Sequence, residues 1–138
     1  MEDKFAHMRP FAKEEVPAAV RTFLNALDWK AQLSPFLGEA DSAELIDGIS
    51  SIESVEEFQS RVSKPFVQKV LDITADEVTF SFPESFDSHG ALLISNHRDI
   101  VLDPSLINMG LLSLNHPTTQ IGIGSNLLET SWVEALVR

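Results

Sequence analysis

Apolar residues in the first half of the chain recur at the spacing of helices. In residues 14–27 the large apolar side chains fall three or four positions apart, on one helical face. Residues 29–37 form a second helical or turn segment that ends at Gly38, and residues 42–49 form a third. These patterns predict short helices rather than strands.

The next helix begins at a capping box. Ser54 is followed three positions later by Glu57, the arrangement that satisfies free N–H groups at a helix start. Pro65 then predicts a break near residues 63–64, with a second helix to about Thr74. Residues 1–75 are therefore predicted to form a helical N-terminal subdomain.

The pattern changes after residue 75. Residues 78–82 alternate apolar and polar side chains, residues 91–94 are consecutively apolar, and residues 120–123 form another short run. Helical spacing separates these runs at residues 106–114 and follows them at 126–137. The segment that connects residues 91–95 to residues 120–123 is long enough to contain a crossover helix, so the two runs can pair as parallel strands. The sequence thus predicts an α/β fold, with a mostly parallel sheet in residues 76–138.

A polar turn lies between residue 94 and the helix that follows. Asp103 and Pro104 are typical of a helix cap and first turn, which leaves His97 between a strand end and a helix start. Open α/β sheets bind their ligands at such positions. His97 is therefore the strongest candidate for chemistry in this chain.

A neutral imidazole takes a proton from an alcohol efficiently when a carboxylate holds its other nitrogen. Helical positions six apart lie about 240° apart around the axis and about 9 Å along it, so Asp103 reaches His97 only if residue 97 precedes the helix. Asp99 is the alternative, but two positions from His97 it points elsewhere in regular backbone. We favour Asp103 as the orienting carboxylate.

Composition narrows the class of function. The chain has a net charge of −11, and 17 of its 21 acidic residues precede residue 91, which argues against nucleic acid as a partner. It has no cysteine, and its histidines lack paired spacing, so no metal site is predicted. No apolar run reaches about 20 residues and the polar N-terminus is not a signal peptide. We expect a cytoplasmic protein, with any membrane contact peripheral.

Residues 91–112, ALLISNHRDIVLDPSLINMGLL, resemble the first signature block of the glycerolipid acyltransferases. That block has Asn-His, four residues, then Asp; Asn96 and His97 match it, but Leu102 occupies the Asp position and Asp103 follows. Residues 121–138 are similar to the helical segment that leads toward the family's second block. The resemblance covers about the last third of the chain, and only the first block is specific.

The resemblance implies acyl transfer from a coenzyme A or acyl carrier protein thioester to a hydroxyl of glycerol phosphate or a lysophospholipid. His97 would be the general base, and no further cofactor is implied. Asn96 either contacts substrate or pins the turn, and Arg98 either contacts an anionic substrate or faces solvent. The implied place is the cytoplasm, with peripheral contact at the inner face of the membrane.

The later signature blocks of the family are missing from residues 76–138. We therefore expect a truncated acyltransferase-like portion, silent in acyl transfer by itself, with an open sheet edge that favours a homodimer. Gly124 and Ser125 precede a predicted helix, where backbone N–H groups can bind phosphate, although glycine there more often serves steric needs.

Two other functions compete with acyl transfer. His97-Arg98-Asp99 mimics the catalytic loop of protein kinases, but Pro104 stands where that loop needs Asn, and the other kinase motifs are missing from the sequence. A non-catalytic interaction module that keeps part of the acyltransferase fold is the remaining alternative, and Leu102 favours it.

Overall fold

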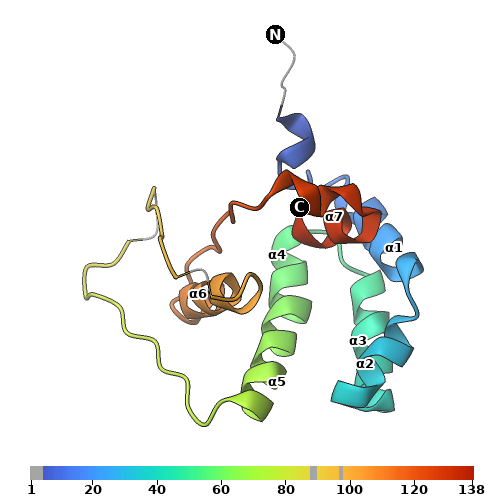
Figure 1. Cartoon of the computed structure of the whole chain (residues 1–138), viewed down its shortest axis with the longest axis horizontal. Helices are drawn as coiled ribbons and strands as arrows, with labels where there is room; N and C mark the ends of the chain where they lie inside the picture. Colours follow the sequence, from blue (N-terminus) through green and yellow to red (C-terminus); the bar gives the residue numbers. More distant parts are fainter. Residues whose placement is uncertain (1–4, 88–89, 97) are drawn as a thin grey trace. The chain divides into compact units, whose positions relative to one another are not determined.

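The computed structural model describes residues 5–87, 90–96 and 98–138. Helices account for 60% of these residues, and none of them belongs to a β-strand (Figure 1). The fold is therefore all-helical, and the predicted α/β class is wrong. The parallel pairing expected between residues 91–95 and 120–123 does not occur, because neither segment is a strand.

The chain divides into two compact units. The first unit comprises Met1–Ser63 and Ile123–Arg138, and the second comprises Lys64–Gly122. The domain boundary expected at residue 75 lies inside the second unit.

The helices predicted in residues 14–58 are confirmed with small changes in their ends, whereas the helix predicted for residues 126–137 is two shorter pieces. Asp28 accepts the N–H of Ala31 at 3.0 Å at the start of the second helix, and Gly38 adopts a φ of 86° between the second and the third. A positive φ is a conformation that glycine adopts without strain. The elements in chain order are η1 (Ala6–Met8), α1 (Val16–Ala26), α2 (Trp29–Leu37), α3 (Glu39–Ser50), α4 (Val55–Phe58), the π-helix η2 (Gln59–Ser63), the 3₁₀-helix η3 (Ser125–Glu129) and α7 (Ser131–Val137).

An aromatic cluster lies at the core of the first unit. Phe23 is buried and stacks on Trp29 with ring centroids 4.2 Å apart, and Trp132 of α7 packs edge-on against Trp29 at 5.8 Å. The indole N–H of Trp29 donates to the carbonyl of Phe23 at 2.6 Å, so its polar atom is satisfied. α7 therefore packs beside α1 although more than a hundred residues separate them (Figure 1).

One of the two hydrogen bonds of the capping box predicted at the start of α4 is present. Ser54 Oγ accepts the N–H of Glu57 at 3.1 Å, while the Glu57 carboxylate accepts the N–H of Glu53, not that of Ser54. The predicted break near residues 63–64 is instead the π-helix Gln59–Ser63, directly before α5 (Lys64–Thr74). Because Pro65 has no N–H to donate, a wider turn just before it avoids an unpaired helical carbonyl.

The second unit holds two helices joined by long extended segments. α5 and α6 (Leu102–Ser113) share a small core of Val67, Leu71 and Met109. The segments predicted as strands at residues 78–82 and 91–95 form no backbone hydrogen bonds with other described residues, and Leu92 and Ile94 are 84% and 87% exposed. A strand needs a neighbouring strand for its N–H and C=O groups and a layer over its apolar face. The described part of this unit supplies no neighbouring strand, which is why the strand predictions fail, although residues 80–82 pack on a helix.

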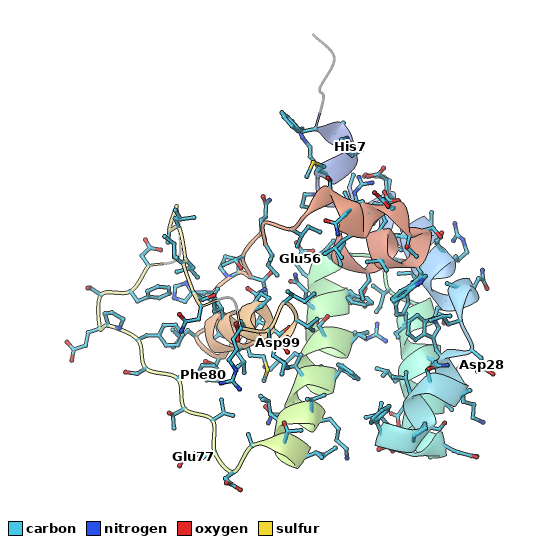
Figure 2. All side chains as sticks on the ribbon, in the orientation of Figure 1. His7, Asp28, Glu56, Glu77, Phe80 and Asp99 are labelled. Carbon is cyan, nitrogen blue, oxygen red and sulfur yellow. The ribbon has the colours of Figure 1, made fainter. Side chains whose placement is uncertain are left out.

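Gly110 lets an extended segment pack closely on α6. A Cβ atom at this position would lie 2.9 Å from Phe80 Cδ1 and 2.9 Å from Phe82 Cζ (Phe80 is labelled in Figure 2). Such distances are shorter than any ordinary carbon–carbon contact. Glycine is in general a weak point inside a helix, whereas here Gly110 gives two aromatic rings room to pack on α6.

Candidate functional site

The turn before α6 is built on two aspartates. Asp99 Oδ1 accepts the N–H groups of Val101 and Leu102 at 2.8 and 2.7 Å, which satisfies two donors at the helix start (Asp99 is labelled in Figure 2). Val101, directly before the helix, makes no side-chain cap bond, so the carboxylate that caps this turn is that of Asp99. The sequence assigned this role to Asp103, which instead lies within the first turn because the helix begins at Leu102.

Asp103 reaches back to the turn that precedes the helix. Its Oδ2 accepts the N–H of Arg98 at 2.8 Å and the N–H of Asp99 at 3.1 Å. Together the two carboxylates form a reciprocal capping arrangement, in which Asp99 bonds forward into the helix and Asp103 bonds backward. The backbone of residues 98–102 is fixed from both sides.

Hydrogen bonding also lowers the pKa of Asp99 below its ordinary value. The N–H of Leu102 contributes most and the N–H of Val101 next, while the charge of Arg98 adds a smaller lowering and partial desolvation opposes all three. Each of these donors stabilises the ionised carboxylate. Asp99 is thus held as an anion at the positive end of the helix.

His97 itself lies outside the described residues. Of its predicted companions, Asn96 and Arg98 are exposed, and Asp103 is half-buried. Leu102, which stands where the acyltransferase block has Asp, is the half-buried first residue of α6. The second unit therefore brings Arg98, Asp99 and Asp103 together in one hydrogen-bonded turn, next to position 97.

The two remaining predicted residues belong to the first unit. Ser125 begins η3, a 3₁₀ segment of five residues, and a bend at Thr130 separates η3 from α7. Gly124 has an ordinary φ of −71°, but the Asn126 side chain occupies the space that a Cβ atom would take. The single helix predicted for residues 126–137 is two shorter pieces.

Within residues 5–87, 90–96 and 98–138, no three His, Asp or Glu side chains gather closely enough to hold a metal ion. Among the helices of these ranges, none has both the length and the apolar character needed to cross a bilayer.

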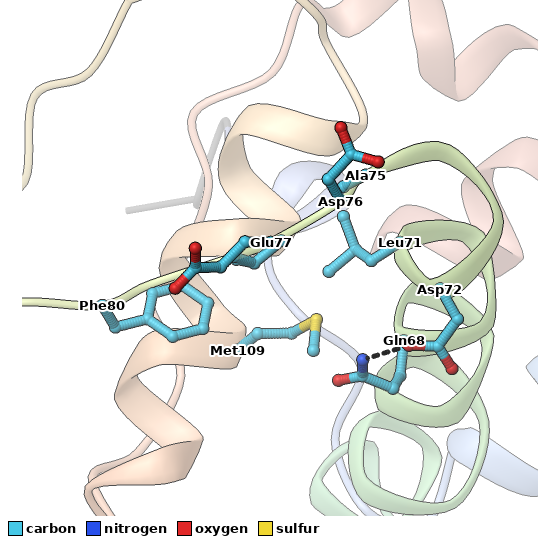
Figure 3. A pocket seen from close by; sticks show the side chains of 9 residues that line it. Gln68, Leu71, Asp72, Ala75, Asp76, Glu77, Phe80 and Met109 are labelled. Carbon is cyan, nitrogen blue, oxygen red and sulfur yellow. Dashed lines mark hydrogen bonds between the residues drawn. The ribbon is translucent and has the colours of Figure 1, made fainter.

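A groove in the second unit was missed by the sequence patterns. It has a volume of about 180 Å³ and lies between α5, the segment that follows it, and Met109 of α6 (Figure 3). Asp72, Asp76 and Glu77 stand at its edge. In the sequence, the groove is marked only by an acidic run close to the end of the amphipathic helix. Such an acidic run is by itself typical of an exposed face.

No protein-family model matches the sequence, and no curated protein or solved structure shows significant similarity to it. The features of this chain that bear on function are the turn before α6, the groove, and the resemblance of residues 91–112 to an acyltransferase block. The turn and the groove both belong to the second unit.

Proposed function

We propose that the protein takes part in acyl transfer from a thioester to a hydroxyl of glycerol phosphate or a lysophospholipid. The turn of residues 96–103 would be the reacting centre, with His97 as general base. The acyl donor would be a coenzyme A or acyl carrier protein thioester, and a lipid acceptor would be met at the inner face of the membrane.

One observation carries the proposal. Asp103 Oδ2 bonds to the N–H groups of the two residues that immediately follow position 97, at 2.8 and 3.1 Å. Asp103 and His97 are six positions apart in the sequence, and on a continuous helix this spacing would hold them apart. Since the helix begins only at Leu102, the chain turns back and the Asp103 carboxylate lies beside the backbone next to residue 97.

This chain would supply two of the groups that the reaction needs, a general base and a carboxylate that orients it. The imidazole of His97 takes the hydroxyl proton as the hydroxyl oxygen attacks the thioester carbonyl carbon, which forms a tetrahedral intermediate. The intermediate collapses, the C–S bond breaks, and the imidazolium returns its proton to the leaving thiolate. Asp103 stabilises the imidazolium and selects the productive tautomer of the ring.

The test is acyl transfer by the intact gene product that contains this sequence, before and after His97→Ala. We expect kcat/KM to fall by a factor on the order of 10²–10⁴, because a general base typically contributes that much. Binding of the acceptor should change little. His7→Ala is the matched control, since His7 is an exposed histidine of the first unit. Equal loss in both variants, or no loss in His97→Ala, would exclude His97 as the base.

A second candidate function is a non-catalytic interaction module. The observation that favours it is the exposure of Leu92, Ile94 and Ile100, large apolar side chains of the second unit without a covering layer. Exposed apolar residues grouped in one segment are typical of surfaces that bind a partner. Self-association without acyl transfer in the intact gene product would support this function over the first.

A further inference from the structure

The groove of the second unit has the size of a single side chain. Its volume is about 180 Å³. Sites for drug-sized ligands measure about 300–1,000 Å³, whereas a cavity of about 150 Å³ accepts a molecule as small as benzene. The groove is therefore too small for a cofactor or a nucleotide, and large enough for one long side chain.

The floor of the groove is apolar. Leu71 and Met109 are buried core residues that form its base, and Val78 and Phe80 line it with partly exposed side chains (Figure 3). An occupant with an aliphatic or aromatic body would remove this apolar surface from water. A small hydrated ion would not.

The edge of the groove is acidic. Gln68 Nε2 donates to Asp72 Oδ1 at 2.8 Å and holds that carboxylate in place, as the dashed line in Figure 3 shows. Asp76 and Glu77 make no hydrogen bond or ion pair with any described residue, so their carboxylates are available to a ligand. Residues 72–87 contain five acidic side chains and no basic one. Charge complementarity therefore selects a cationic occupant.

We propose that this groove binds a lysine or arginine side chain presented by a partner polypeptide. The aliphatic stem would lie on Leu71, Met109 and Val78, and the cationic head would pair with Asp76 and Glu77. Lysine and arginine combine an apolar stem with a charged end in this way. The groove is separate from the turn before α6, and the proposal does not depend on acyl transfer.

The test measures binding of a short peptide by amide chemical-shift changes of the ¹⁵N-labelled protein at about 0.15 M salt. The probe is an acetylated and amidated pentapeptide with one lysine between two leucines, and a peptide with glutamine in place of lysine is the neutral control. We expect saturable shifts at residues 71–80 and at Met109 with the lysine peptide only. The double variant Asp76→Asn/Glu77→Gln should weaken binding on the order of tenfold, because two charge-assisted pairs are lost.

A matched variant separates the groove from the general negative field of the protein. Glu84→Gln/Glu129→Gln removes the same charge from two exposed positions outside the groove, and should leave the peptide's Kd within about twofold. Equal weakening in both double variants would overturn the proposal, and so would equal binding of the glutamine peptide. Shifts of the same signals by Ca²⁺ without any response to the lysine peptide would identify a cation site and also overturn it.

Discussion

The two units differ in how far they bury their apolar side chains. In the first unit, apolar side chains of helices from both ends of the chain enclose one core around Phe23 and Trp29. In the second unit, two helices share a small core and the extended segments expose Leu92 and Ile94 to solvent. The candidate turn and the groove both lie in the second unit. The most enclosed core lies in the first unit, while both candidate sites lie in the second.

The largest expected effect is loss of the aromatic core. Phe23→Ala should lower the free energy of unfolding by about 3–5 kcal/mol, because the side chain is buried between Trp29 and Phe58. Urea denaturation followed by tryptophan fluorescence measures it. Phe36→Ala is the control, since Phe36 is 72% exposed and should change stability by no more than about 0.5 kcal/mol. Similar losses in both variants would mean that the first unit has no such core.

Two helical glycines offer the next comparison, one from each unit. Gly110→Ala should destabilise by about 1–2 kcal/mol, because the new methyl group would overlap Phe80 and Phe82. Gly48→Ala in α3 should stabilise by about 0.5–1 kcal/mol, since its nearest neighbour, the Arg61 guanidinium, lies 3.8 Å away and alanine favours a helix. Thermal unfolding by circular dichroism gives both values. If Gly110→Ala also stabilises, the close packing of residues 80–82 on α6 is wrong.

A smaller effect distinguishes two carboxylates whose pKa values are lowered. The pKa of Glu57 in the first unit is lowered mainly by the N–H of Glu53 and then by Arg61, which lies 2.6 Å away, whereas backbone N–H groups dominate at Asp99. Both groups therefore stabilise the fold above their ordinary pKa, and this contribution is lost as the pH falls through the folded values.

Carbon-detected NMR titration in 0.1 M and 1 M salt measures these pKa values. We expect the midpoint of Glu57 to move toward its ordinary value in 1 M salt more than that of Asp99, because the ion pair with Arg61 is screened. The titration of both groups in urea is the control, and should give ordinary midpoints. A folded midpoint of Asp99 equal to its value in urea would contradict its capping role.

The smallest effect concerns self-association of the second unit. Leu92→Ser/Ile94→Ser should lower the dimer fraction measured by analytical ultracentrifugation, because it removes exposed apolar surface from one extended segment. Phe36→Ser is the matched control, as it removes an exposed apolar residue from the first unit. A dimer fraction that falls only in the control would place the contact in the first unit.

The sequence predicts what depends on near neighbours along the chain. Helices such as α2, with Asp28 at its start and Gly38 at its end, are stabilised by bonds within a few residues, so their residue patterns are sufficient evidence. The apolar run at residues 91–94 also suits a strand, but a strand depends on partners that the pattern cannot supply. The strand predictions failed for this reason, while most helix predictions were confirmed, with the exception of residues 126–137, which form two shorter pieces.

The candidate site, like the fold, was predictable only where it depends on residues close together in the sequence. Asp99 and Asp103 are identifiable from the polar turn, but their roles as forward and backward caps depend on the first residue of α6, which the sequence placed later in the chain. The groove depends on contact between α5 and Met109, which are more than thirty residues apart. No local pattern reports such a contact.

The central claim is that Asp103 orients His97 for acyl transfer, and one kinetic comparison tests it most directly. The kcat/KM of the intact gene product is measured for Asp103→Asn and for Asp99→Asn; both amides keep an acceptor oxygen for the backbone but lose the charge. The account predicts a loss on the order of 10²–10⁴ for Asp103→Asn, since a neutral amide no longer stabilises the imidazolium, and a loss below about tenfold for Asp99→Asn. Full activity of Asp103→Asn, or a larger loss in Asp99→Asn, would contradict it.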